Sequence, residues 1–148
     1  MIIKPLKTSQ IEKLATLEKE CFRYPWTKNM FVQEAENPFA HYFVAQQKEE
    51  LIGYAGMWKV LNEGHITNIA VTPAYRRTGV GRQLLNTLIE EAVKLEIKVL
   101  MLEVRKSNKA AIDLYSSAGF VISGCRKGYY PDSEDAILMD LVLMGGNE

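Results

Sequence analysis

The sequence predicts an α/β protein built around a mixed sheet of about seven strands flanked by four helices. Strand-like and helix-like segments follow in the order strand, two helices, three strands, helix, strand, helix and two strands. The 148 residues are 47% hydrophobic and 24% charged, which is typical of a globular chain that buries one core. Because no repeat, low-complexity tract or linker divides the chain, we expect a single domain over residues 1–148.

The first 38 residues predict a short strand followed by two helices. Residues 2–6 form an apolar, strand-like segment. Ser9-Gln10-Ile11-Glu12 has the spacing of a capping box, and apolar residues at helical intervals predict a helix that ends near Phe22. Thr27 is suited to cap a second, short helix, which Asn37-Pro38 ends.

Three strands and a long helix are expected next. The strands are expected over residues 41–46, 51–60 and 65–71. Gly53 and Gly56 weaken the second of these strands or favour a bulge in it. The helix is expected over residues 81–95, because one of its faces is apolar. This face carries Leu84, Leu85, Leu88, Ile89, Ala92 and Val93.

The last third of the chain alternates between strand and helix again. In residues 99–104, odd and even positions alike are apolar until Glu103, which predicts a central strand covered on both faces. A helix is expected over residues 108–118, and Gly119 suits the position that follows its end. Two further strands are expected over residues 120–127 and 136–143, and a frayed tail over residues 145–148.

The charge balance and the cysteines exclude several classes of function. Eighteen basic residues balance eighteen acidic ones, so no overall positive field favours nucleic-acid binding. No stretch approaches the roughly 18–20 apolar residues of a membrane span, and the N-terminus has no signal-peptide core. Cys21 and Cys125 form no paired motif and indicate a reducing, cytoplasmic location. His41 and His65 lack metal-ligand spacing, so no metal site is expected.

The most informative segment is a basic loop, Arg76-Arg77-Thr78-Gly79-Val80-Gly81, between a strand and a helix. Gly79 and Gly81 permit a positive φ and a close approach of the backbone, so free N–H groups at the helix start can bind a diphosphate. The loop lacks the Gly-Lys-Ser/Thr of the Walker A motif, and Leu84 stands where a dinucleotide fingerprint has its third glycine. A solvated basic turn capping a surface helix is the alternative.

The same loop fits the Gln/Arg-x-x-Gly-x-Gly/Ala pattern of N-acetyltransferases that bind acetyl-CoA. Further similar segments are Cys21–Trp26, Thr67–Val71, Leu102–Ala111, Leu114–Phe120 and Tyr129–Ala136. Over essentially its full length, the chain resembles the GNAT acetyltransferase superfamily, which implies the GNAT acyl-CoA N-acyltransferase fold. Pro25-Trp26, Glu103 and Tyr129-Tyr130-Pro131 resemble the branch that acetylates the N-terminal alanine of ribosomal proteins.

The resemblance implies acetyl-CoA as co-substrate. In the family, the fourth strand bulges and splays from the fifth, and the pantetheine arm lies in the gap. The resemblance implies that backbone groups of Ile69, Ala70 and Val71 bond the arm, and that Asn108 meets its far end. A plain helix N-cap is the alternative for Asn108. The residues implied to wrap the pyrophosphate are Arg77, Thr78, Gly79, Val80, Gly81 and Arg82.

Glu103 and Tyr115 are the candidates for acid–base chemistry. Glu103 ends the expected central strand, where open α/β sheets bind ligands, although it could instead face water or pair with Arg105 or Lys106. The resemblance implies direct attack of an amine on the thioester, with Glu103 as general base and Tyr115 as general acid at the departing thiolate. A core tyrosine with a satisfied hydroxyl is the alternative for Tyr115.

The resemblance also implies where an acceptor lies. Segments matching Tyr24-Pro25-Trp26 and Tyr129-Tyr130-Pro131 flank the acceptor groove in the family, which makes Trp26 and Tyr130 candidate substrate-binding residues. Trp26 could equally be a core plug between the first two helices. The acidic residues near the second segment are expected to form a solvated turn. These are Asp132, Glu134 and Asp135.

The expected acceptor is the α-amine of an N-terminal alanine on a small-subunit ribosomal protein. Freeing an α-amine of pKa near 7.8 at pH 7 costs about 1 kcal/mol, whereas a lysine of pKa near 10.4 needs about 4.6 kcal/mol. One carboxylate is therefore an adequate base for an α-amine. Acetylation of lysine or of a small amine stays an alternative, as does a non-catalytic module that binds acyl-CoA.

Overall fold

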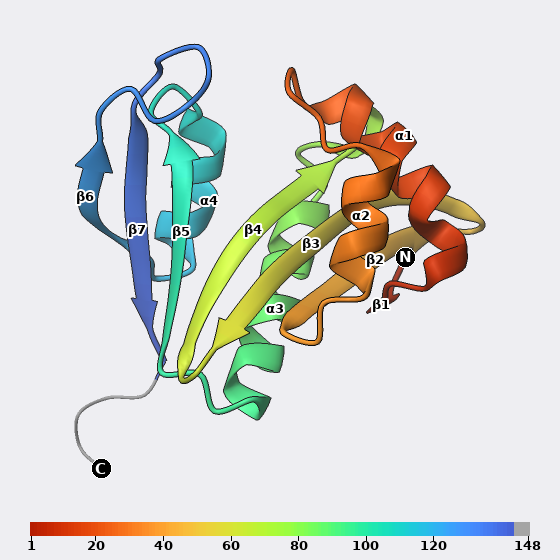
Figure 1. The fold of residues 1–148 in the computed structure, drawn as a ribbon, viewed down its shortest axis with the longest axis horizontal. Helices are drawn as coiled ribbons and strands as arrows, with labels where there is room; N and C mark the ends of the chain where they lie inside the picture. Colours follow the sequence, from red (N-terminus) through yellow and green to blue (C-terminus); the bar gives the residue numbers. More distant parts are fainter. Residues whose placement is uncertain (144–148) are drawn as a thin grey trace.

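The structure, a computed structural model, describes residues 1–143, so the tail expected over 145–148 lies outside it. A seven-stranded sheet has the order β1-β2-β3-β4-β5-β7-β6 (Figure 1). Its strands are β1 (Ile2–Pro5), β2 (Ala40–Gln47), β3 (Glu50–Val60), β4 (Glu63–Val71), β5 (Val99–Arg105), β6 (Val121–Arg126) and β7 (Ala136–Val142). The α-helices of the described part are α1 (Ile11–Cys21), α2 (Lys28–Ala35), α3 (Val80–Lys94) and α4 (Lys109–Ser117). The predicted fold class, a mixed sheet of seven strands with four helices, is confirmed.

Side-chain caps begin two of the helices, one at the predicted Thr27 and one at Asn108, where a cap was the alternative. Thr27 Oγ1 accepts the N–H of Met30 at 3.2 Å at the start of α2. Asn108 Oδ1 accepts the N–H of Ala111 at 3.1 Å at the start of α4. Such caps satisfy backbone donors that have no partner inside the helix, which is why these two starts are legible in the sequence.

Three local predictions are wrong. The chain enters α1 through a 3-10 turn over Thr8–Gln10, so the N–H of Lys7 donates to Gln10 Oε1 at 2.8 Å in place of the expected capping box at Ser9. Val93, expected on the apolar face of α3, is 52% exposed, because that face is narrower than its spacing suggested. β5 alternates between buried and half-buried residues, so it is fully covered on one face only.

Helices cover both faces of the sheet. α3 and α4 contribute Leu84, Leu88 and Tyr115 to a core cluster on one face. α1 and α2 contribute Leu14 and Phe31 to a second cluster on the other face. In Figure 1, α1 and α2 lie in front of the central strands and α3 lies behind them. No helix within residues 1–143 combines the length and the apolarity that crossing a membrane requires.

β4 and β5 are parallel neighbours that separate after three residues. Glu63–His65 pair with Val99–Met101, and the strands then diverge toward their carboxyl ends (Figure 1). β4 also carries a bulge, because Ile66 and Asn68 face consecutive residues of β3 and Thr67 between them faces none. The resulting gap opens at the carboxyl ends of two parallel strands, the position where open α/β sheets bind ligands.

Candidate active site

The basic loop between β4 and α3 presents free backbone N–H groups. Gly79 has a φ of +92°, and α3 begins directly after it. Gln83 is the first residue of α3 whose N–H bonds back along the helix, to the Gly79 carbonyl at 3.1 Å. The N–H groups of Val80, Gly81 and Arg82 therefore have no partner within the helix. These amides and the positive end of the helix dipole suit a diphosphate, as the sequence predicts.

The end of β4 offers a backbone edge toward the gap. Residues 69–71 pair with β3 on one side and have no partner in β5 on the other. The Val71 carbonyl is already engaged, because it accepts Arg76 Nε at 3.0 Å and Cys21 Sγ at 3.4 Å. An extended ligand that pairs with this edge therefore competes with Arg76 for the Val71 carbonyl.

The first turn of α3 is joined to the last residue of α4. The Arg82 guanidinium, in the first turn of α3, donates to the Ser117 hydroxyl on α4. Asn108 caps α4 through Oδ1, which bears out the alternative that the sequence left open. The cap uses only the oxygen, so the side-chain NH₂ of Asn108 keeps two donors for a ligand.

Glu103 lies on β5 beyond the point where β4 leaves it. Its side chain is 19% exposed, and Oε1 lies 3.2 Å from Nε2 of His65 on β4. His65 is in register with Met101, two residues before Glu103, so both side chains project from one face of the sheet. The alternative partner Arg105 bonds elsewhere. Sequence reasoning gave His65 no role, because only the parallel register of β4 and β5 brings it to Glu103.

Tyr115 lies in the core on the other face of the sheet. It is 7% exposed on α4, and its ring packs against Phe120 with centroids 5.6 Å apart. It shares a core cluster with Leu102, whose neighbour Glu103 projects to the opposite face. Burial raises the pKa of Tyr115, and a charge on nearby Tyr130 raises it further. Tyr115 is thus a buried phenol that stays protonated at neutral pH.

Arg105 organises the loop that carries Tyr130. Its Nη1 lies 3.0 Å from both carboxylate oxygens of Asp132 and 2.9 Å from Glu134 Oε1. The guanidinium is 4.2 Å from the ring centroid of Tyr130 and 6.0 Å from that of Tyr24. Asp132 lies in an exposed turn, as expected, but the turn also pairs with Arg105, and this hydrogen bonding holds the pKa of Asp132 below its usual range. One side chain thus links the two segments predicted to flank the acceptor.

Tyr130 itself is half-buried between this arginine and its neighbours. Burial is the main reason that the pKa of Tyr130 is raised, to about 12. A charge on Glu103 contributes to the same pKa shift, as a charge on Tyr130 does for Tyr115. Tyr130 is therefore near enough to Glu103 on one side and to Tyr115 on the other for charges to interact.

Trp26 is held from two sides. Its ring packs against Phe31 with centroids 5.4 Å apart, and its backbone N–H donates to Glu18 Oε2 at 3.1 Å. Glu18 is 1% exposed and also accepts the Tyr54 hydroxyl at 2.6 Å. Trp26 thus packs between the first two helices, as the core-plug alternative expected.

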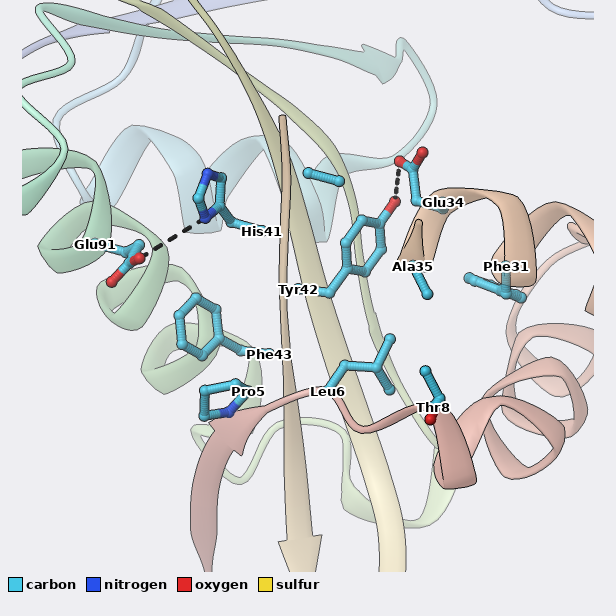
Figure 2. Close-up of a pocket in the computed structure, with 11 residues that line it drawn as sticks. Pro5, Leu6, Thr8, Phe31, Glu34, Ala35, His41, Tyr42, Phe43 and Glu91 are labelled. Carbon is cyan, nitrogen blue, oxygen red and sulfur yellow. Dashed lines mark hydrogen bonds and ion pairs between the residues drawn. The ribbon is translucent and has the colours of Figure 1, made fainter. Parts of the chain in front are cut away.

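None of the predicted site residues lines the cleft of about 270 Å³ shown in Figure 2. That cleft lies among β1, α2 and β2, with Leu6, Glu34 and Tyr42 in its wall. Two of the predicted segments lie instead at the carboxyl ends of the separating strands: the basic loop follows β4, and Arg105 at the end of β5 contacts the Tyr130 ring. The gap between the strands is therefore the candidate active site.

Comparisons with known proteins show which family the chain belongs to. The model of the Acetyltransferase (GNAT) family matches residues 11–120. The [Ribosomal protein bS18]-alanine N-acetyltransferase of Escherichia coli strain K12 is 38% identical over 144 residues, which cover 95% of this chain and 97% of that protein. A crystal structure of the ribosomal-protein-S18-alanine N-acetyltransferase from Escherichia coli has a TM-score of 0.90 and 38% identity, covering 99% of this chain and 97% of that one.

A more distant structure, the NatC complex bound to Gag peptide and CoA, has a TM-score of 0.84. It is 23% identical and covers 97% of this chain and 98% of that one, so it shares the fold. The family match spans most of the chain, and the relative from Escherichia coli matches almost all of it at well over 30% identity. The chain therefore belongs to the GNAT acetyltransferase family and is an acetyl-CoA-dependent N-acetyltransferase.

Proposed function

We propose that this enzyme acetylates the α-amine of the N-terminal alanine of ribosomal protein bS18. The relative with that printed activity in Escherichia coli is 38% identical over nearly the whole chain. The observation that carries the proposal for this molecule is one arrangement around the β4–β5 gap. Free amides lie at the start of α3 where β4 ends, Glu103 lies on β5 beyond the residues paired with β4, and Tyr115 is a buried phenol on α4.

Acetyl-CoA lies along the gap in this proposal. The backbone N–H groups of residues 77–82 and the side chains of Arg77 and Arg82 hold its diphosphate. The edge of β4 at Ile69–Val71 pairs with the pantetheine arm, and the NH₂ of Asn108 contacts the arm from α4. The unpaired edge of β4 and the free amides of α3 support this orientation. It directs the thioester toward Glu103 and Tyr115.

The reaction is a direct transfer without an acyl-enzyme. Glu103, directly or through a water, takes a proton from the ammonium group of the peptide. The freed lone pair forms the N–C bond at the thioester carbonyl, and the C–S bond breaks as the electron pair leaves with sulfur. Two protons leave the nitrogen in total; one goes through Glu103 to solvent and the equivalent of the other ends on the CoA thiol. Freeing an α-amine costs about 1 kcal/mol at pH 7, within reach of one carboxylate.

Tyr115 assists the departing sulfur. A thiol has a pKa of about 8.5, and burial raises the pKa of Tyr115 above that of an ordinary phenol, so full proton transfer to the thiolate is uphill. The favourable contribution of Tyr115 is a hydrogen bond that strengthens as negative charge develops on sulfur. Burial of the phenol strengthens such a bond because little water competes for it.

The acceptor peptide lies between the Tyr24 and Tyr130 segments that Arg105 connects. Tyr130 lines this channel, and Trp26 supports its other wall through the packed segment that precedes α2. Aromatic walls with accessible backbone edges suit an extended peptide terminus.

The test is acetylation of a synthetic peptide with the N-terminal sequence of bS18. The peptide and acetyl-CoA are incubated with the pure protein, and the mass gain of one acetyl group and the release of free thiol are measured. A matched peptide with a blocked α-amine and a free lysine is the control. We expect acetylation of the first peptide only. Acetylation of the blocked peptide would favour a lysine acceptor, and CoA binding without turnover on either peptide would contradict the proposal.

A further inference from the structure

One tyrosine ties the bulge of β4 to two other elements of the fold. Tyr42, on β2, has its hydroxyl oxygen 3.1 Å from Oγ1 of Thr67, the bulged residue. The same hydroxyl donates to Glu34 Oε2 on α2 at 2.8 Å (Figure 2). Because β3 separates β2 from β4 in the sheet, the side chain of Tyr42 spans a whole strand to reach Thr67.

This span depends on a glycine in β3. Gly56 is in register with Tyr42 on one side and with Asn68 on the other. A Cβ at Gly56 would lie 2.4–2.8 Å from three ring atoms of Tyr42, so the ring rests directly on the backbone of β3. The register shift that creates the bulge falls between Gly56 and Met57, at this same point. Only a residue without a side chain permits the contact.

The hydrogen bonds run in one direction. A carboxylate accepts, so Tyr42 gives its one proton to Glu34 and its oxygen accepts the proton of Thr67. Glu34 is 7% exposed and also accepts Trp58 Nε1, which fixes the carboxylate. Burial is the main reason that the pKa of Tyr42 is raised, so the hydroxyl of Tyr42 stays protonated further into alkaline solution than an ordinary phenol.

The bulge occupies a decisive place in β4. Pairing of β4 with β5 ends at His65, two residues before Thr67. The proposed cofactor edge begins at Ile69, two residues after Thr67. A bulged residue has no partner in the ladder, so its conformation depends on side-chain contacts such as the one to Tyr42. The bulge sets the direction in which β4 leaves β5, and hence the distance across the gap to Glu103.

We propose that Tyr42 is a positioning residue for acetyl transfer, because through Thr67 it fixes the β4 bulge and so aligns the thioester on β4 with Glu103 on β5. This inference rests on the proposed function. Since Thr67 is apart from the loop that holds the diphosphate, loss of the contact should lower kcat and leave CoA affinity nearly unchanged. A misplacement of about 1 Å suffices to slow a positioned reaction substantially.

The test is a set of four variants assayed with acetyl-CoA and the bS18 peptide. Thr67→Val removes the hydroxyl at nearly constant shape, Thr67→Ser keeps it, and Tyr42→Phe removes its partner. We expect kcat to fall about fivefold or more in Thr67→Val and Tyr42→Phe, and less than about twofold in Thr67→Ser. The double variant Tyr42→Phe/Thr67→Val should be no slower than the slower single variant. The Kd of CoA, measured by calorimetry, should change by less than about twofold.

Other results would overturn this inference in distinct ways. A kcat of Thr67→Val equal to that of the wild type, or a double variant that loses the product of the two single effects, contradicts it. If Tyr42→Phe does not fold, as its Tm would reveal, the comparison of Thr67→Val with Thr67→Ser decides alone, because both leave the bond between Tyr42 and Glu34 in place. A wild-type protein without activity overturns the proposed function, and this inference with it. An active wild type with an unaffected Thr67→Val overturns the inference alone.

Discussion

His65 Nε2 and Glu103 Oε1 lie 3.2 Å apart, at the point where β4 and β5 stop pairing. His65 is the last residue of β4 that pairs with β5, and Glu103 lies on β5 two residues beyond its partner Met101. The proposed base is therefore held by both strands that enclose the proposed thioester. A hydrogen bond that fixes the rotamer of a reacting group is the kind of support that a productive geometry requires.

Replacement of Glu103 by Gln should lower kcat for the bS18 peptide at least tenfold, because an amide of the same shape cannot accept a proton. The Kd of CoA should change little, since Glu103 is remote from the free amides of α3. Thiol release gives kcat, and calorimetry gives the Kd. Glu90→Gln, an exposed position on α3, is the matched control. Turnover of Glu103→Gln at the wild-type rate would remove Glu103 from the role of base.

Replacement of His65 by Gln should lower kcat about three- to tenfold, because the carboxylate loses the partner that orients it. His41 offers a matched control, since its Nδ1 lies 3.8 Å from Glu91 Oε2 on α3, a similar pair outside the site. His41→Gln should turn over normally. Because His65 acts through Glu103, the double variant His65→Gln/Glu103→Gln should be no slower than Glu103→Gln. An additive loss would show that His65 has an independent role.

These two residues also show what sequence alone could predict. The caps at Thr27 and Asn108 were legible because each bond joins residues three apart. His65 and Glu103 are 38 residues apart, and only the parallel register of two strands unites them. Local spacing carries no information on that register. The gap itself was expected from family resemblance, since divergence of two strands leaves no periodic signal in the sequence.

The contacts of the loop near Tyr130 are not legible in the sequence for a related reason. Asp132 and Glu134 follow one another in a polar turn, which is typical of a solvated segment. Their partner Arg105 precedes them by 27 and 29 residues, and α4 and β6 lie between them along the chain. A long-range ion pair of this kind follows from the packing of the whole chain, and a pattern of charges along the sequence does not reveal it.

Replacement of Tyr115 by Phe should lower kcat at least tenfold and leave CoA affinity nearly unchanged, because only the hydrogen bond to the departing sulfur is lost. The pH profile gives a second test. Burial raises the pKa of Tyr115, so the phenol stays protonated further into alkaline solution than an ordinary one. Deprotonation of Tyr115 should therefore cause no loss of kcat below about pH 10. An alkaline loss near pH 8–9 that Tyr115→Phe abolishes would contradict this role.

Replacement of Arg105 by Lys should raise the KM of the peptide several-fold and leave the KM of acetyl-CoA unchanged. Lysine keeps the charge and loses the planar fork that contacts Asp132, Glu134 and the ring of Tyr130 together. Arg126→Lys is the matched control, since Arg126 lies 5.6 Å from the ring centroid of Tyr129 on the outer strand β6. A peptide KM equal to that of the wild type would show that the Tyr130 loop does not bind the acceptor.

Replacement of Glu18 by Gln should change how stability depends on pH. Burial raises the pKa of Glu18 above 4.5, so the native state binds this proton more tightly than the unfolded chain does. The stabilising contribution of Glu18 is therefore complete below about pH 4 and is lost as pH rises through the native pKa. Glutamine does not titrate. As pH falls from 7 to 4, the free energy of unfolding of the wild type should therefore increase relative to that of Glu18→Gln, as measured by urea denaturation. Glu12→Gln, at an exposed position of the same helix, is the control and should not change the pH dependence of stability. If the free energies of unfolding of the wild type and Glu18→Gln changed in parallel with pH, the raised pKa of Glu18 would be contradicted.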